Sequence, residues 1–134
     1  MKIAAMVGES GSGKTTALES LIRHYVAHGL SVGAIKHTHH PINTAGRGDT
    51  ARLRRAGAEP VILAGDRKAV VFAGDDASVI EYASPRDLVA RFTTDVLLIE
   101  GFKSAGEWPR VELRAGEWLT VEELVRRCEA SRAS

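Results

Sequence analysis

A glycine-rich stretch near the start of the chain limits its possible folds more than any other feature. Residues 8–16 read Gly-Glu-Ser-Gly-Ser-Gly-Lys-Thr-Thr and match G-x-x-x-x-G-K-[ST], the pattern of a phosphate-binding P-loop. Gly11 and Gly13 can adopt backbone dihedrals that other residues avoid, which lets successive N–H groups point at phosphate oxygens. A helix that follows such a loop adds the positive end of its dipole. The stretch therefore predicts a site for a nucleoside triphosphate.

This loop supplies most of the predicted binding residues: Gly8, Ser10, Gly11, Ser12, Gly13, Lys14, Thr15 and Thr16. Lys14 is expected to reach the β- and γ-phosphates as a catalytic cation, and the Thr15 hydroxyl to ligand Mg²⁺ beside them. The alternative is a glycine-rich turn that binds nothing. Its flanks argue against that alternative, because the apolar run at residues 2–7 predicts a buried parallel strand and residues 18–26 carry apolar side chains at helical spacing.

Alternating strand and helix patterns continue along the chain. Residues 30–36 predict a second strand, and the helix before it completes a βαβ unit with parallel strands. Further strand patterns lie at residues 60–64, 69–73, 95–101 and 108–113, and helix patterns at 51–57, from 84 and from 120. The sequence thus predicts an α/β fold, the three-layer sandwich of P-loop NTPases with a mostly parallel central sheet. We expect one domain at residues 1–130 and a frayed tail at 131–134.

The end of the second strand carries a basic cluster. Lys36 and His37 stand there, followed by His39, His40 and a loop rich in turn-forming residues. Ligands of open α/β sheets bind outside the carboxyl ends of the strands, so Lys36 and His37 are predicted to contact phosphate or substrate. An exposed histidine-rich loop is the alternative. Structural zinc is disfavoured, because a closed site needs four suitably spaced ligands and the sequence has no second Cys/His group.

Two acidic residues are predicted to serve the metal. Asp49 precedes an arginine-rich helix and can hold Mg²⁺ through water, or it can simply cap that helix. The three arginines of that helix either meet an anionic substrate or form a solvated face. Glu100 follows the aliphatic residues 96–99, where P-loop proteins place the acidic group of their Walker B segment. It is expected to act catalytically, by holding the Mg²⁺ water shell or orienting an attacking group, and capping of the strand end is the alternative.

Composition narrows the choice of partners and compartment. The net charge of +1 gives no case for binding nucleic acid or an anionic membrane. No stretch approaches the roughly 18 apolar residues of a membrane span, and the N-terminal apolar run is too short for a signal peptide. The single cysteine, Cys128, excludes an intramolecular disulfide and falls in the apolar stripe of the last helix, where a core role is expected. We expect a cytoplasmic protein.

Four segments together resemble one family. They are the P-loop, the stretch 36–40, the stretch 48–50 before the arginine-rich helix, and Ile-Glu-Gly-Phe-Lys at 99–103. From the first strand to about Leu113 the chain resembles the molybdopterin-guanine dinucleotide biosynthesis adaptor family, MobB. The resemblance implies GTP and Mg²⁺ as ligands, weak GTP hydrolysis, and a homodimer. It also implies service to the guanylyltransferase MobA, which attaches GMP to molybdopterin.

The resemblance gives Lys14, Thr15 and Glu100 the phosphate and metal roles. The chain departs from the family pattern in length, since only residues 104–119 separate the Glu-Gly-Phe-Lys segment from the last helix. It also has no Asn-Lys-x-Asp motif, so a preference for GTP follows from the resemblance alone. The competing hypotheses are a small-molecule kinase that uses ATP and a protein that keeps nucleotide only as a structural or regulatory ligand.

Overall fold

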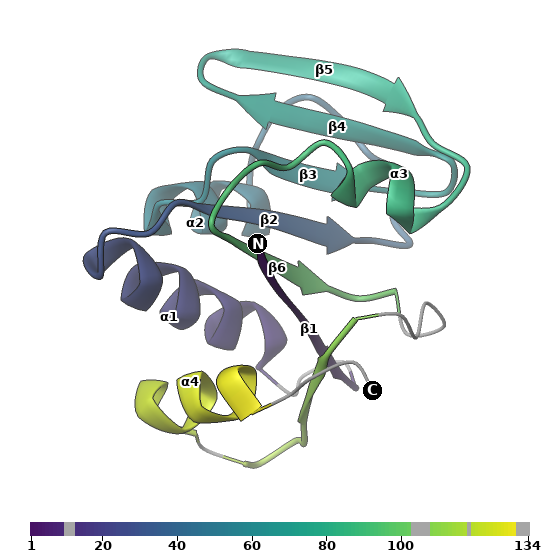
Figure 1. Ribbon diagram of the computed structural model, residues 1–134. Helices are drawn as coiled ribbons and strands as arrows, with labels where there is room; N and C mark the ends of the chain where they lie inside the picture. The colour runs from purple at the N-terminus through teal and green to yellow at the C-terminus, as the bar shows by residue number, and fades with distance from the viewer. Residues whose placement is uncertain (10–12, 103–107, 118, 131–134) are drawn as a thin grey trace.

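A seven-stranded sheet forms the centre of the molecule (Figure 1). The structure is a computed structural model that describes residues 1–9, 13–102, 108–117 and 119–130. The strands follow the order β5-β4-β3-β2-β6-β1-β7 across the sheet. Their bounds are β1 Lys2–Gly8, β2 Val32–His37, β3 Val61–Ala64, β4 Lys68–Ala73, β5 Asp76–Glu81, β6 Val96–Glu100 and β7 Arg110–Leu113. Among the described strands, the pairings of β3 with β4 and of β4 with β5 are antiparallel and the other four are parallel. The predicted mostly parallel α/β sheet is confirmed.

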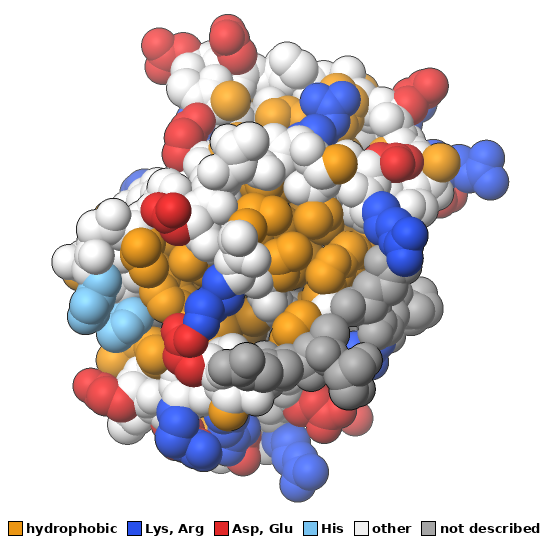
Figure 2. All heavy atoms as spheres, viewed as in Figure 1, with side chains coloured by type: hydrophobic (Ala, Val, Ile, Leu, Met, Phe, Trp, Pro, Cys, Tyr) orange, Lys and Arg blue, Asp and Glu red, His pale blue; other side chains and the backbone are white. Residues whose placement is uncertain are grey.

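Helices cover both faces of this sheet, in three layers. Helices α1 (Lys14–Ala27), α2 (Asp49–Ala56) and α4 (Val121–Ala130) share one face, where Leu18, Leu53 and Leu124 pack with alternate residues of β1, β2 and β6. The short α3 (Pro85–Val89) lies on the other face and buries Leu88 and the nearby Phe92. Figure 2 views the molecule from that second face, on which hydrophobic side chains remain visible between charged ones.

Strand β6 enters the sheet between β1 and β2. Glu100 is paired in register with Met6 of β1 on one side and with Lys36 of β2 on the other. Because directly paired residues of parallel strands share a face, Lys36 and Glu100 are neighbours on the face that α1 and α2 cover. The βαβ unit predicted for the first two strands is therefore parallel, with a third strand between its members.

The remaining predicted strands are found, and one additional strand joins them. Residues 69–73 lie in β4, which pairs antiparallel with β3, and β7 is an edge strand that starts after Pro109. Strand β5 is additional; five of its six residues are exposed and Ile80 is partly buried. An edge strand with so little apolar surface has no strong hydrophobic alternation by which the sequence could reveal it.

Helix starts agree with the sequence in two cases and differ in one. Ser84 and Asp87 form a capping box at the predicted start of α3, and the Glu123 N–H donates to Thr120 Oγ1 (3.2 Å) at the start of α4. The N-cap of α2 is Gly48 at φ 64°, and no side chain caps this helix. The capping role considered for Asp49 is therefore wrong. Cys128 is 3% exposed inside the core, as predicted, and the described residues include no helix long and apolar enough to cross a membrane.

Candidate nucleotide site

The glycine-rich stretch joins the end of β1 to the start of α1. Gly13 takes the left-handed conformation at φ 85° directly before Lys14, the first residue of the helix. A Cβ there would meet no atom within 4 Å, so the requirement for glycine comes from the backbone and not from crowding. The Lys14 Nζ donates to the carbonyl oxygen of Gly8 (2.7 Å), which holds its ammonium over the start of the loop. The predicted residues Ser10, Gly11 and Ser12 lie outside the described residues.

Three oxygen-bearing side chains from three elements meet beside this turn. Thr15 Oγ1, in the first turn of α1, lies 3.1 Å from each carboxylate oxygen of Glu100 at the end of β6. The same hydroxyl lies 3.4 Å from Oδ2 of Asp49, the first residue of α2. We call Thr15, Asp49 and Glu100 the oxygen cluster. The structure thus brings together the three residues predicted as metal ligands.

Lys36 supplies the positive charge of the oxygen cluster. Its Nζ lies 3.0 Å from Asp49 Oδ2 and 3.1 Å from both carboxylate oxygens of Glu100. The side chains of Lys36 and Glu100 are only 18% and 6% exposed, so water screens this pair poorly. Burial on its own lowers the pKa of Lys36, but the Glu100 and Asp49 carboxylates outweigh burial and raise that pKa above its ordinary value. Lys36 therefore stays protonated at neutral pH.

The donor set of the oxygen cluster suits a hard divalent cation. Carboxylate and hydroxyl oxygens are the ligands that Mg²⁺ takes in proteins. No three His, Cys, Asp or Glu side chains in the described parts of the chain are grouped to hold a metal, so such a site depends on the Thr15 hydroxyl as its third oxygen. The ammonium of Lys36 lies between the Asp49 and Glu100 carboxylates, at a position where a positive charge neutralises both. The residues present therefore fit the ion.

Arg52 borders the oxygen cluster on its outer side. Its guanidinium donates to Glu19 (3.1 Å) and to the Thr16 hydroxyl (3.4 Å), and it lies 3.6 Å from an Asp49 oxygen. Arg54 points elsewhere, donates to the Gly74 carbonyl oxygen and lies over the Phe72 ring, and Arg55 is exposed. Of the three arginines of α2, one therefore reaches the site.

His37 points away from the oxygen cluster, because successive residues of a strand face opposite sides of the sheet. Its ring stacks on Phe102 with centroids 4.2 Å apart and an angle of 17°, and it meets the edge of the His39 ring at 5.0 Å. Burial and the neighbouring His39 lower the pKa of His37, against the opposing effect of Asp66. The predicted pair of Lys36 and His37 is thus divided between two places.

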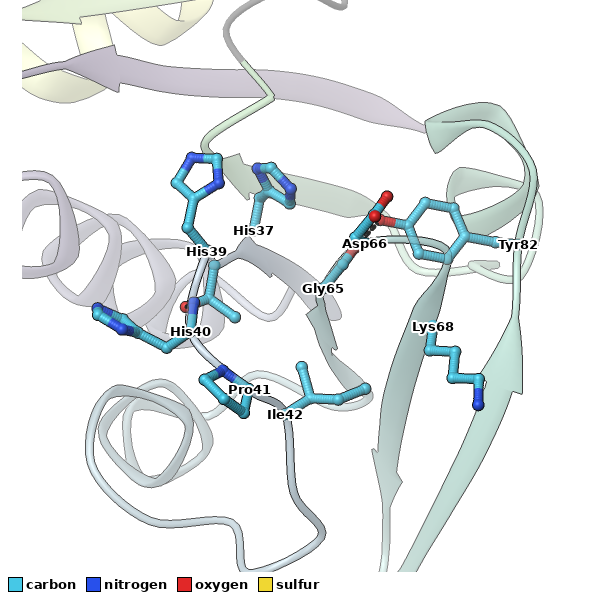
Figure 3. Close-up of a pocket in the computed structure, with 10 residues that line it drawn as sticks. His37, His39, His40, Pro41, Ile42, Gly65, Asp66, Lys68 and Tyr82 are labelled. Atoms are coloured by element: carbon cyan, nitrogen blue, oxygen red, sulfur yellow. Dashed lines mark hydrogen bonds between the residues drawn. The ribbon is translucent and has the colours of Figure 1, made fainter.

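A cavity of about 650 Å³ lies on the side of His37 (Figure 3). His37 at the end of β2 lines it together with His39 and Ile42 of the following loop. Asp66 and Tyr82 come from the β3–β4 turn and the segment after β5. Sequence reasoning did not single out Asp66 or Tyr82. The turn at residues 65–68 after an apolar strand was the available signal, but nothing in it indicates which strand end it will face.

The sheet, the glycine turn into α1 and the acidic end of β6 define a P-loop NTPase-like α/β protein. The crystal structure of a MobB protein homolog from Bacillus stearothermophilus matches this fold with a TM-score of 0.52 at 20% identity, over 98% of this chain and 73% of the other. The crystal structure of Bacillus subtilis MobB matches with a TM-score of 0.52 at 28% identity, over 100% and 76% of the two chains.

Sequence comparison gives the family. The family described as molybdopterin guanine dinucleotide synthesis protein B matches residues 3–130. The molybdopterin-guanine dinucleotide biosynthesis adapter protein of Escherichia coli is 34% identical over 125 residues, which cover 92% of this chain and 71% of the relative. That of Haemophilus influenzae is 38% identical over 103 residues, which cover 75% and 57%. The chain belongs to the MobB family, and it spans little more than half the length of the Haemophilus relative.

Proposed function

We propose that this protein binds GTP with Mg²⁺ and acts as an adapter in molybdopterin guanine dinucleotide biosynthesis, where it assists MobA in attaching GMP to molybdopterin. The observation that carries the proposal is the oxygen cluster of Thr15, Asp49 and Glu100 beside Lys14. The names of the relatives, which are biosynthesis adapter proteins, supply the pathway.

The residues of the site divide between phosphate binding, metal binding and hydrolysis. Backbone N–H groups of the P-loop sequence would bind the phosphates, and Lys14 would leave the Gly8 carbonyl to contact the β- and γ-phosphates. Thr15, Asp49 and Glu100 would hold Mg²⁺, which offsets phosphate charge when it is bound. Lys36 then turns from the two carboxylates toward the terminal phosphate. Glu100 is placed to orient an attacking water, so we expect slow GTP hydrolysis.

Titration calorimetry with GTP, GDP, ATP and ADP, each with and without Mg²⁺, tests the nucleotide and the metal together. We expect GTP with Mg²⁺ to bind most tightly. Lys14→Ala should weaken triphosphate binding by about 1.5–3 kcal/mol, which is the usual contribution of a hydrogen bond to a charged group. Arg23→Ala is the matched control, because Arg23 is an exposed cation on the same helix. Equal triphosphate affinity in Lys14→Ala and the wild type would show that Lys14 does not bind phosphate.

The ATP arm separates this proposal from a small-molecule kinase. Tight ATP binding with no response to GTP would favour the kinase. For the adapter, we expect MobA to be retained on the immobilised protein in the presence of GTP and Mg²⁺. We also propose a homodimer, which sedimentation velocity measures directly.

A further inference from the structure

The cavity beside His37 is a separate space from the nucleotide site. Lys36 and His37 are adjacent in β2, but Lys36 contacts the oxygen cluster and His37 lines the cavity on the other face of the sheet. A nucleotide anchored at Lys14 and Thr15 would have to pass around the end of β2 to enter it. An occupant of the cavity is therefore a second molecule, close to the nucleotide but not part of it.

Aromatic side chains stand on two sides of this cavity. Figure 3 shows His37 and His39 rising from the end of β2, with Tyr82 across from them beyond Asp66. The Tyr82 hydroxyl donates to the Gly65 carbonyl, which fixes the ring against the β3–β4 turn. The His37 ring is fixed in turn by its stack on Phe102. Two held ring systems with space between them suit a flat heteroaromatic ligand.

Asp66 supplies a hydrogen-bond acceptor between these rings. The described residues include no hydrogen-bond or ion-pair partner for its carboxylate, which lines the cavity. The charge of Asp66 acts on both rings. It acts to raise the pKa of His37, and it adds to burial, the larger cause, in raising the pKa of Tyr82. A carboxylate accepts two N–H bonds at once from neighbouring donors on a ring edge. Lys68 adds a positive charge at the rim, beside the turn.

A metal is not the occupant that this lining favours. Within the described ranges no three His, Cys, Asp or Glu side chains are grouped to hold an ion, although three histidines line the cavity. Figure 3 shows why, since the His40 ring points away from His37 and Asp66. The histidines thus contribute ring surface and single hydrogen bonds.

We propose that this cavity binds the 2-amino-4-oxopyrimidine ring of a second molecule, with Asp66 accepting from the ring N–H and amino groups. A pterin and a guanine share this ring edge. The inference rests on the proposed function, because the relatives act in molybdopterin guanine dinucleotide biosynthesis. It locates the pterin-bearing substrate next to the nucleotide site and gives its recognition to residues outside the P-loop.

The test is equilibrium binding of pterin-6-carboxylate, followed by its fluorescence, to the full chain. Lumazine-6-carboxylate, which has an oxygen in place of the 2-amino group, is the matched ligand control, and GMP tests guanine as the source of the ring. We expect pterin-6-carboxylate to bind at least about tenfold more tightly than lumazine-6-carboxylate, and Asp66→Asn to remove that preference, as expected for a two-bond contact. Asp76→Asn, a carboxylate at the opposite end of the β4–β5 hairpin, should bind as the wild type does.

The outcomes separate this inference from the proposed function. Lys14→Ala should keep its pterin affinity while losing GTP, so a failure of the GTP assignment leaves the cavity assignment standing. GMP binding that depends on Asp66 would assign the ring to a guanine compound, and pterin binding that depends on Asp66 would assign it to a pterin. No binding of either compound, equal binding by Asp66→Asn and the wild type, or displacement of the pterin by GTP with Mg²⁺ in proportion to nucleotide bound would overturn the proposal.

Discussion

At the scale of single residues, Lys36 is the internal cation of the oxygen cluster. Its pKa is raised in the folded protein by Glu100 and Asp49, against the effect of burial. A raised folded-state pKa gives stability that is fully present below the unfolded lysine pKa of about 10.4 and is lost as pH rises through the higher folded value. We therefore expect the stabilising contribution of Lys36 to be constant from pH 7 to 9 and to fall above about pH 10.5.

Urea unfolding of Lys36→Met and of the wild type across this pH range measures the contribution. At pH 7 we expect Lys36→Met to lose about 3 kcal/mol, because two carboxylates then lack their partner, and the difference should shrink at alkaline pH. Lys68→Met is the control, since Lys68 is an exposed lysine at the start of β4. A pH-independent difference between Lys36→Met and the wild type would show that loss of packing, and not loss of charge, accounts for the effect.

Single residues of the site were predictable where a motif ties them to the backbone. The positions of Lys14 and Thr15 follow from the P-loop pattern, which fixes the order of strand, loop and helix locally. The position of Glu100 follows from the acidic end of the buried aliphatic run at residues 96–99. The sequence left Asp49 as either a metal ligand or a helix cap, since a carboxylate at a helix start is compatible with both roles. Its contact with Lys36 is visible only in the structure. Asp66 could not be predicted as a site residue, because only the pairing of β2 with β3 brings it near His37.

At the scale of elements, the segment after α3 packs closely against β2 because Gly33 of β2 has no side chain. A Cβ on Gly33 of β2 would lie 2.3 Å and 2.5 Å from two ring carbons of Phe92. Gly33→Ala should therefore destabilise the protein by about 1–3 kcal/mol through overpacking. Urea unfolding checks this value, and Gly33→Ala combined with Phe92→Leu should be more stable than the sum of the two single effects. Strict additivity would indicate that the two positions do not touch.

Element types were more predictable than element neighbours. The βαβ pattern indicates that β1 and β2 run parallel, but it does not indicate that β6 separates them. That insertion depends on the buried aliphatic residues 96–99, which form a central strand equally well at several positions in a sheet. The exposed β5 has no strong hydrophobic alternation, so its pairing with β4 became visible only in the structure.

At the scale of the whole molecule, ligand binding should appear as added stability. A ligand that binds only the folded state at one hundred times its dissociation constant contributes about 2.7 kcal/mol. We expect GTP with Mg²⁺ to raise the free energy of unfolding by about this amount, and removal of the metal with a chelator to reverse most of it. Lys14→Ala should show a much smaller rise at the same concentrations. Stabilisation that survives chelation would separate nucleotide binding from the oxygen cluster.

The central place of β6 also matters while the chain is being made. In the folded sheet β1 and β2 lie two strand spacings apart, about 10 Å, because residues 96–100 pair with both of them. At about 5–20 residues per second, the ribosome finishes the P-loop several seconds before it releases Glu100. A nascent chain therefore carries the phosphate loop without its acidic partner. The topology delays assembly of the oxygen cluster until most of the polypeptide has emerged, so under the proposed function an unfinished chain should not yet hold nucleotide together with Mg²⁺.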